Sequence, residues 1–263
     1  MPIGNDADIT QRVVDCLAKV PVIFCEDTRV TMGLLRRYGI LNQQQLMRMD
    51  QHQEYRSMSQ LDDALRSGDA AFVSDAGSPG LSDPGALLIE HAHQTGVHVS
   101  VLPGASALTA FIAIAGVQLT SFYFGGFLPK KTTDINQCMQ WCHQHQLLGI
   151  WFESPRRICR LVATVADLFP TVPVVFAKEL TKPYERVYRG SITNVKEQMS
   201  SENTNGEWVV MVDFRQMIAE ESIDYHRIAS ELKEAQLTHK QVKQMARLLH
   251  CSKNKLCQAF QAL

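Results

Sequence analysis

A loop rich in glycine and proline is the part of the chain best suited to bind a ligand. Residues 74–85 read S-D-A-G-S-P-G-L-S-D-P-G and follow a short apolar run at 70–73, which predicts a buried parallel strand. The glycines let backbone atoms approach a ligand closely, and the prolines hold the loop in one shape. Asp75 and Asp83 offer acceptors for hydroxyl or ammonium groups, or cap the following helix. An ordinary strand-to-helix turn is shorter, so we expect a binding loop.

Further polar groups follow the ends of other predicted strands. These groups are Glu26, Asp27 and Arg29 after 20–25, Ser106 after 98–102, Glu153 after 148–152, and Glu179 with Lys182 after 174–177. Parallel strands present their carboxyl ends at one edge of a sheet, where open α/β proteins bind ligands. We therefore expect a polar cleft between two domains whose strand ends face one another. A helix cap or a surface turn is the alternative for any one group taken alone.

The composition describes a globular protein without a strong overall charge. The chain has 263 residues, 45% of them hydrophobic, and a net charge of −1, so any nucleic-acid contact must come from local patches. Seven cysteines are an odd number without a disulfide framework, which indicates a reduced, cytoplasmic protein. The sequence has no signal peptide and no apolar run of 18 residues, so we expect no membrane span.

Apolar periodicity predicts helices and strands that alternate along the chain with short connections. The predicted helices are 8–19, 30–38, 60–66, 86–93, a small-residue segment that follows 103–107 and reaches about 115, 133–146, a segment reaching 169, and the tail from 220. The predicted strands are 20–25, 70–74, 98–102, 122–124, 148–152, 174–177 and 208–212, while 42–56 is a polar stretch. This alternation is the pattern of an α/β protein with doubly wound parallel sheets. We expect α/β domains at 1–118 and 119–215, followed by a helical tail at 220–263.

The sequence contains helix-start signals in the glycine-rich loop and in the tail. At the glycine-rich loop, Ser82 or Asp83 is the expected N-cap, with Pro84 at the first helical position. In the tail, Thr238 and Gln241 form a capping-box pattern, and Ser252 is a second expected N-cap. A helix–turn–helix with outward cations and a plain helical pair packed on the body are both open. The cations concerned are Lys240, Lys243, Arg247, Lys253 and Lys255.

Two other groups of side chains suggest binding. Cys138, Cys142, His143 and His145 resemble a metal-ligand cluster, but zinc sites usually draw a second ligand pair from elsewhere, so we expect no metal. Cations and aromatic residues follow several predicted strands, and these suit phosphate contact and stacking on unpaired bases. They are Phe127, Lys130, Lys131, Arg156, Arg157, Arg160, Lys182, Tyr184, Arg186, Tyr188 and Arg189. A solvated face of charge pairs is the alternative.

With these motifs in place, the chain resembles the ribosomal RNA small subunit methyltransferase I family of the tetrapyrrole methylase superfamily. The motifs occur in family order along nearly the whole chain. They are P-I-G-N at 2–5, E-D-T-R-V-T at 26–31, the loop at 74–85, L-P-G-A-S-A at 102–107, G-F-L-P-K at 126–130, F-E-S-P at 152–155 and E-L-T-K at 179–182. The resemblance implies two α/β domains with S-adenosyl-L-methionine in the cleft between them, a homodimer, and a C-terminal helical extension.

The resemblance also implies an activity and a set of binding residues. The activity is methylation of the ribose 2′-hydroxyl of a cytidine in small-subunit (16S) ribosomal RNA. The implied cofactor-binding residues are Pro2, Asp75, Ala76, Gly77, Leu81, Ser106, Ala107, Glu153 and Leu180. A small-molecule methylase of the tetrapyrrole type and a non-catalytic RNA-binding paralogue are the alternatives.

Three positions depart from the family pattern. Family members carry a strand and a short loop before P-I-G-N, whereas this chain begins at Met1 and Pro2. A start codon assigned too late, another segment filling the gap, and a degenerate paralogue are the expectations to weigh. Arg156 stands where the family often has histidine, and Lys178 stands where it usually has arginine. Because both residues are cationic, we expect them to affect RNA contact more than cofactor binding.

Methyl transfer to a hydroxyl needs alignment above all, and a base or a nearby charge assists it. The expected catalytic residues are Asp27, Glu153 and Lys182. A carboxylate of Asp27 or Glu153 would act as the base, with Lys182 or Arg29 near a phosphate. The alternative for Asp27 is a structural ion pair with Arg29.

Overall fold

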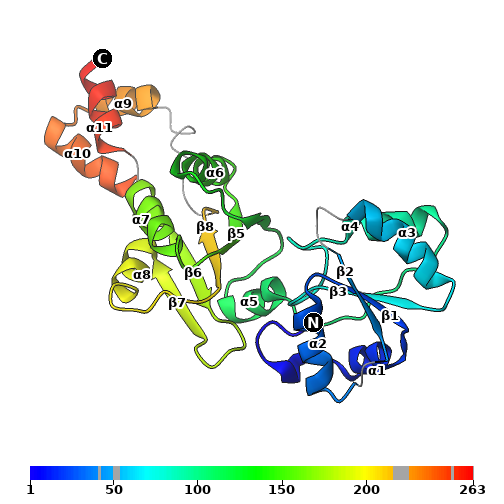
Figure 1. The fold of residues 1–263 in the computed structure, drawn as a ribbon. Helices are drawn as coiled ribbons and strands as arrows, with labels where there is room; N and C mark the ends of the chain where they lie inside the picture. The colour runs from blue at the N-terminus through cyan, green and yellow to red at the C-terminus, as the bar shows by residue number, and fades with distance from the viewer. Residues whose placement is uncertain (41–42, 50–53, 216–224, 250–251, 263) are drawn as a thin grey trace. The chain divides into compact units, whose positions relative to one another are not determined.

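The computed structural model describes residues 1–40, 43–49, 54–215, 225–249 and 252–262 (Figure 1). The chain divides into two compact units, which are described separately below. The first unit comprises 1–118, 177–187 and 206–209. The second unit comprises 119–176, 188–205 and 210–263.

A three-stranded parallel sheet forms the centre of the first unit. Its order is β2 (Gln45–Arg48), β1 (Val22–Cys25) and β3 (Ala70–Val73). Val22 lies opposite Gln45 on one side and opposite Ala70 on the other, so β1 and β3 end at the same edge. Strands β1 and β3 confirm the sequence prediction. Strand β2 was not predicted, because its outer residues are exposed and its apolar signal is only two residues long.

Helices α1 (Gln11–Lys19) and α2 (Thr28–Arg37) cover one face of this sheet (Figure 1). Ile23 and Cys25 of β1 point to that face and pack with Leu17 of α1 and Leu35 of α2. A short 3-10 turn, η1 (Asp6–Asp8), precedes α1. Thr10 caps α1 by accepting from the Val13 amide, so the helix begins later than the predicted residue 8.

Helices α3 (Glu54–Leu65) and α4 (Ala86–Gln94) pack on the opposite face. The intervening residues of β1, Val22 and Phe24, point there, because side chains alternate between the faces of a strand. The first unit therefore has helices on both faces of a parallel sheet, which is the predicted doubly wound arrangement.

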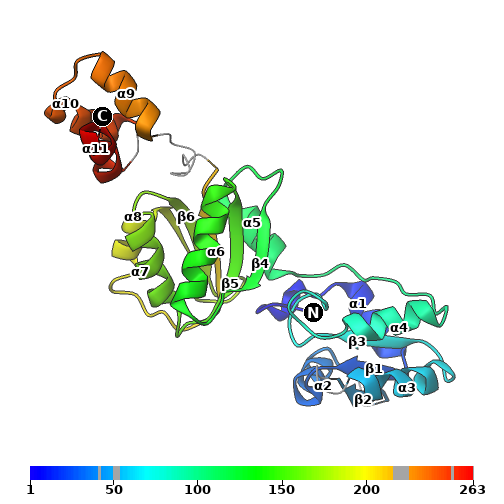
Figure 2. The ribbon, with the colours of Figure 1, turned by 90° about the horizontal axis from the view of Figure 1, so that it is seen from above.

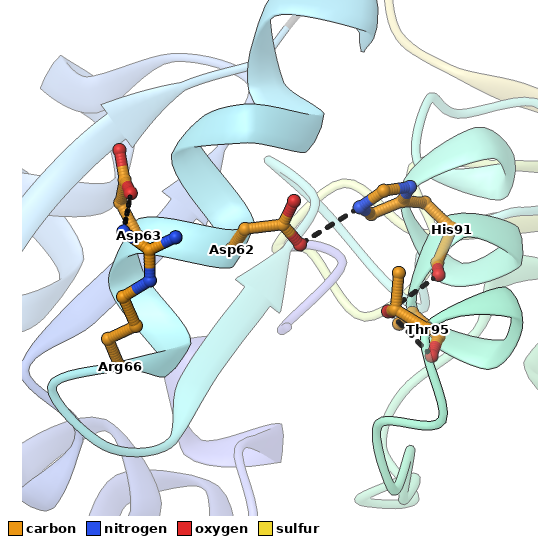
Figure 3. A network of polar contacts seen from close by, with 6 residues as sticks. Asp62, Asp63, Arg66, His91 and Thr95 are labelled. Atoms are coloured by element: carbon orange, nitrogen blue, oxygen red, sulfur yellow. Dashed lines mark hydrogen bonds and ion pairs between the residues drawn. The ribbon is translucent and has the colours of Figure 1, made fainter.

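A polar network ties α3 to α4 near the surface (Figure 3). His91 Nε2 lies 3.0 Å from Asp62 Oδ1, and Thr95 Oγ1 donates to the His91 carbonyl at 2.9 Å. Arg66 pairs with Asp63 beside it. The His91–Asp62 contact thus joins the two helices in addition to their apolar packing.

The predicted strand at 98–102 is wrong. The segment has no strand assignment, and the described residues give it no ladder partner. Its side chains still pack, because Val99 and Leu102 contact the apolar clusters of the two sheet faces, while Val101 is exposed. Apolar alternation predicted the packing correctly, but a strand also needs a neighbour for its backbone groups. The segment leads to α5 (Ala107–Ala115), as predicted.

A five-stranded sheet is the centre of the second unit. Its order is β4 (Tyr123–Phe127), β5 (Leu148–Glu153), β8 (Trp208–Asp213), β6 (Pro173–Lys178) and β7 (Arg186–Ser191). Four of these strands confirm predictions. Strand β7 was missed, because four of its six residues are polar or glycine and it alternates around a single buried tyrosine.

Helices α6 (Thr132–Gln144), α7 (Ile158–Leu168) and α8 (Ile192–Gln198) accompany this sheet, with α6 packed beside α7 and α7 beside α8 (Figure 2). Helix α8 was not predicted; it is two turns long and begins at Ser191, which accepts from the Asn194 amide. Among the described residues, no helix combines the length and the apolar character that a membrane crossing requires.

The tail forms three helices with a core of their own. They are α9 (Tyr225–Glu234), α10 (His239–Leu248) and α11 (Lys253–Ala262), and Figure 2 shows them packed on one another. The predicted capping box is confirmed, because Thr238 N donates to Gln241 Oε1 at 2.9 Å and Gln241 N donates to Thr238 Oγ1 at 3.4 Å. The predicted helical start at 220 lies outside the described residues.

Candidate functional site

The glycine-rich loop is folded against the end of β3. The buried Ser74 hydroxyl lies 3.1 Å from the carbonyls of both Ala76 and Gly77, which turns the loop back on itself. Gly85 has a φ of +120°, and an added Cβ there would lie 2.6 Å from Cζ of Phe72. Gly85, not the predicted Ser82 or Asp83, therefore precedes the first helical residue Ala86.

Two backbone-to-carboxylate hydrogen bonds join the ends of β1 and β3. Asp27 N donates to Asp75 Oδ1 at 3.1 Å, and Asp75 N donates to Glu26 Oε1 at 3.2 Å. The bonds form because the two strands are parallel neighbours in register. The expected gathering of polar groups at this edge is present within the first unit.

Three carboxylates in this cluster affect one another. Burial raises the pKa of Glu26, and the nearby charges of Asp83 and Asp75 raise it further against one backbone hydrogen bond. Burial, with the Asp75 charge, also raises the pKa of Asp83. The cluster therefore favours protons or another cation among its members. Glu26 and Asp83 were predicted as polar groups at strand ends but were not assigned to cofactor binding or catalysis.

Asp27 is held by its neighbour Arg29. The carboxylate accepts the Arg29 amide at 2.8 Å as the N-cap of α2, and Arg29 Nη2 lies 2.6 Å from Oδ2. Hydrogen bonds from the Arg29 side chain and amide hold the pKa of Asp27 far below its usual range. A carboxylate with so low a pKa is a weak base, which favours the ion-pair reading.

The N-terminal segment crosses the glycine-rich loop. Pro2 O accepts the Gly77 amide at 3.2 Å, and the Met1 ammonium donates to Gly77 O at 2.5 Å. Burial lowers the pKa of that ammonium. Pro2 and Gly77, both expected at the cofactor, are thus brought together.

The loop before α5 lies against the same glycine-rich segment. Ser78 Oγ donates to the Ala105 carbonyl at 3.4 Å, and a Cβ on Gly77 would lie 3.6 Å from that carbonyl oxygen. Ser106 follows as the N-cap of α5, and its side chain makes no capping bond. The predicted residues Ala76 and Ser106 therefore lie in neighbouring loops, Ala107 begins α5, and Leu81 is half-buried farther along the glycine-rich loop.

Lys182 is enclosed by two carboxylates of the same unit. Its Nζ lies 3.0 Å from Glu179 Oε1 and 2.9 Å from Glu207 Oε2. Burial alone would lower the pKa of Lys182, but the hydrogen bonds to Glu207 and Glu179 outweigh it and raise the pKa. Glu207, far away in the sequence, was missed because no local pattern links it to this lysine.

The turn at 179–182 packs against the N-terminal segment. A Cβ added to Gly4 would lie 2.9 Å from Lys182 Cε and 3.1 Å from the Leu180 carbonyl oxygen. Glu179 and Thr181 both have left-handed backbone angles, with φ of +53° and +66°. Such angles are uncommon outside glycine and cluster at functional sites. Leu180 therefore joins Pro2 and Gly77 in one assembly of loops.

Glu153 lies in the second unit, at the end of β5. It is fully buried, and its Oε1 accepts from the Ser154 amide at 2.6 Å and lies 2.7 Å from Arg157 Nε. Arg157 Nη1 donates onward to the carbonyls of Leu128 and Pro129, at 3.0 and 3.4 Å. Glu153 thereby positions the arginine and the loop after β4.

The two cationic departures from the family pattern differ in exposure. Arg156 is exposed, whereas Lys178 is buried with its Nζ 6.0 Å from the centre of the Trp208 ring. Lys178 does not lie on a surface that RNA could reach in this structure. Cys142 and His143 are also buried, and the described residues hold no group of three or more potential metal ligands.

Comparison with known proteins places these features in a family. Residues 1–196 match the family model "Tetrapyrrole (Corrin/Porphyrin) Methylases". Ribosomal RNA small subunit methyltransferase I of Neisseria meningitidis serogroup B is 36% identical over 214 residues, 80% of this chain and 73% of the relative. The chain belongs to the ribosomal RNA small subunit methyltransferase I family, within the tetrapyrrole methylases. Its relative in Leptospira biflexa is 34% identical over 215 residues, 81% of this chain and 88% of the relative.

Solved structures of the tetrapyrrole methylase type share the fold. Diphthine synthase aligns with a TM-score of 0.61 at 14% identity, over 81% of this chain and 83% of that one. The methyltransferase CobJ aligns with a TM-score of 0.57 at 18% identity, over 80% and 90%. The predicted α/β class and the predicted membership of the methyltransferase I family are both confirmed.

Proposed function

We propose that this methyltransferase moves a methyl group from S-adenosyl-L-methionine to the ribose 2′-hydroxyl of a cytidine in small-subunit ribosomal RNA. The names of its relatives, which specify small-subunit ribosomal RNA, support the substrate. The observation that carries the donor is the assembly of four segments within the first unit. These segments are 1–4, 75–78, 105–107 and 179–182.

The chemistry of that assembly suits a cationic donor. Two of its segments, D-A-G-S at 75–78 and A-S-A at 105–107, have mostly small side chains, which permits close approach to their backbone amides and carbonyls. Beside them, Glu26 and Asp83 have raised pKa values, and a positive group among them relieves the repulsion. S-adenosyl-L-methionine, when bound, supplies an ammonium, a sulfonium and the transferable methyl group. Asp75, Ala76, Gly77, Leu81, Ser106, Ala107, Pro2 and Leu180 remain the proposed contacts.

Alignment is the main proposed source of catalysis. Transfer forms a bond from the ribose oxygen to the methyl carbon, breaks the sulfur–methyl bond, and releases the hydroxyl proton to a base or to water. Asp27 and Lys182 are each engaged in ion pairs, so they are better suited to fix the loops than to exchange protons. Orientation of two reactants alone can supply several kcal/mol, about 7 to 11 in the best intramolecular cases.

A ribosomal RNA substrate also has implications for the binding partners and the cellular location of the protein. We propose a cytoplasmic homodimer whose basic tail contacts RNA. Residues 225–263 hold seven lysines and arginines against two glutamates, whereas the whole chain has a net charge of −1. Lys240, Lys243, Lys253 and Lys255 are exposed on this three-helix unit, and the side chain of Arg247 lies outside the described residues.

The deciding experiment has two steps. Calorimetric titration of S-adenosyl-L-methionine into the chain tests the donor site. Radiolabelled methyl transfer to small ribosomal subunits, followed by nuclease digestion and mass spectrometry, then identifies the methylated atom. Label on a cytidine ribose supports the proposal. Transfer only to a tetrapyrrole supplied in place of the subunits would favour the small-molecule alternative, and RNA binding, measured separately, without donor binding would favour the non-catalytic one.

A further inference from the structure

A bulge in β4 turns Phe127 toward the face of the sheet that carries Phe152. Phe124 pairs with Ile150 and Phe127 pairs with Phe152, so β4 uses one more residue than β5 over the same length. The extra residue falls at Gly125 and Gly126, and Gly126 has a φ of +61°. A Cβ on Gly125 would lie 2.5 Å from Trp151 Cδ1, so the buried indole requires glycine there. Bulges of this kind re-aim a side chain.

Phe127 is supported on one side and open on the other. Its ring meets Phe152 edge-on with centroids 5.6 Å apart, and Phe152 meets Phe124 in the same way at 5.1 Å. Phe127 is nevertheless 58% exposed. The sheet thus holds a large apolar ring in water at a fixed place, which costs hydrophobic free energy unless a partner covers the ring.

Two arginines at the start of α7 bind the backbone carbonyls that follow Phe127. Arg157 donates to the Leu128 and Pro129 carbonyls, and Arg160 Nη2 donates to the Lys130 carbonyl at 2.7 Å. Leu128 is buried and anchors the segment from below. The loop is therefore preorganised, so little ordering entropy opposes binding.

Exposed cations lie in this loop and in the segment whose arginines bind it, and the acids of both segments have partners. Segments 122–134 and 150–160 contain five lysines and arginines but only two acids, Glu153 and Asp134. Glu153 is buried against Arg157, and Asp134 accepts from the Thr133 hydroxyl at 2.9 Å. The exposed cations are Lys130, Lys131, Arg156 and Arg160.

We propose that Phe127 and these four cations form a platform for an unpaired nucleotide of single-stranded RNA. The base stacks on Phe127, and neighbouring phosphates meet the cations. Aromatic rings combined with a basic surface are the usual means of holding unpaired bases. A protein partner with an acidic surface would match the cations but would offer no base to stack on the exposed ring. The inference rests on the proposed RNA substrate and names the surface of the second unit that holds it.

The test compares Phe127→Ala with Phe127→Trp and with the control Phe122→Ala, whose ring is exposed but lies just before β4, at the opposite end of the strand from Phe127 and the cationic loop. The measurements are affinity for a small-subunit ribosomal RNA transcript at fixed salt, the KM for RNA, and affinity for S-adenosyl-L-methionine. Loss of one stacked base corresponds to roughly 5- to 150-fold weaker RNA binding. We expect that loss for Phe127→Ala, recovery for Phe127→Trp, and no change in donor affinity.

A charge variant separates the two parts of the platform. Arg156→Ala should reduce the salt dependence of RNA binding by about one phosphate contact without changing stability. RNA affinity that is equal for Phe127→Ala, Phe122→Ala and the wild type overturns the platform while methyl transfer to RNA continues. A wild-type chain that transfers no methyl group to RNA overturns the proposed function. In that case, a roughly 5-fold or larger loss of RNA affinity in Phe127→Ala, without such a loss in Phe122→Ala, would still support the platform.

Discussion

The fully buried carboxylate of Glu153 is paired with Arg157, with 2.7 Å between Oε1 and Nε. The other oxygen, Oε2, is buried without a hydrogen-bond partner among the described residues. Removing the arginine would leave a buried charge uncompensated, which usually costs about 3 to 5 kcal/mol. We expect Arg157→Met to lower the free energy of unfolding by that amount, measured by urea titration of tryptophan fluorescence.

The double variant Glu153→Gln with Arg157→Met is the matched control. It removes both charges together, so we expect it to recover much of the loss. A single Arg157→Met variant within 1 kcal/mol of the wild type would contradict the importance of the pair.

Asp27 offers a test of base catalysis against structure. Because Arg29 holds the pKa of Asp27 far below neutrality, this carboxylate accepts protons poorly. We expect Asp27→Asn to keep kcat within about tenfold of the wild type, since a group with so little basicity contributes little proton transfer. A loss beyond 100-fold with unchanged donor affinity would instead establish Asp27 as the base.

Donor binding should depend on pH through Glu26 and Asp83. Burial raises both pKa values, so in the free protein these groups keep protons to a higher pH than ordinary carboxyls do. A cationic donor must displace those protons, so its affinity should fall as the pH falls through the raised pKa values. The limit is about tenfold per pH unit for each group that titrates. Calorimetry of S-adenosyl-L-methionine binding from about pH 4 to 8 measures this. The range begins near the usual carboxyl pKa values and extends above them.

Glu26→Gln should have opposite effects on stability and on binding. A carboxyl with a raised pKa binds protons more tightly in the folded state, so its contribution to stability declines as the pH rises through that pKa. The neutral amide escapes this loss and retains an oxygen for the Asp75 amide. We expect a higher Tm near pH 7, together with weaker donor binding and a flatter pH profile. An unchanged pH profile would exclude Glu26 from the donor site.

Two glycine-to-alanine changes contrast packing with helix propensity. A Cβ at Gly4 collides with the Lys182 side chain and crowds the Leu180 carbonyl, so Gly4→Ala should weaken donor binding by disturbing that loop. Gly33 lies within α2, where an added Cβ has ordinary room, and Gly33→Ala should stabilise by about 0.5 to 1 kcal/mol. Equal donor affinity in Gly4→Ala and Gly33→Ala would show that the 179–182 turn is not part of the donor site.

Deleting 220–263 should weaken use of RNA more than binding of the donor. Helices α9–α11 have an apolar core made from residues of the tail itself. Alanine at Lys240, Lys243, Lys253 and Lys255 in the full chain should reproduce much of the RNA defect and reduce the salt slope. Equal losses of RNA and donor binding after deletion would mean that the tail is structural.

The sequence predicted local features that depend on near neighbours. Strand β1, helix α5 and the Thr238–Gln241 capping box follow from apolar spacing and cap chemistry over a few residues. Strands β2 and β7 were missed because their own residues carry weak apolar signals. The segment 98–102 was wrong because pairing depends on a partner that its own residues do not specify.

The candidate site was predictable in outline and not in its pairings. Strand-end motifs indicated Asp75, Gly77 and Leu180, and the loops that carry them lie in one unit. The bond from Lys182 to Glu207 and the pKa values of Glu26 and Asp83 depend on tertiary burial, which no local pattern contains.

The self-contained tail gives the isoelectric point of 6.7 an unusual meaning. Residues 1–224 hold 25 acidic residues against 19 lysines and arginines, while the tail is strongly basic. The neutral average therefore describes neither part, and the polypeptide behaves as a block polyampholyte. In dilute buffer the tail of one molecule attracts the body of another, so solutions should become turbid at low ionic strength and clear on adding salt.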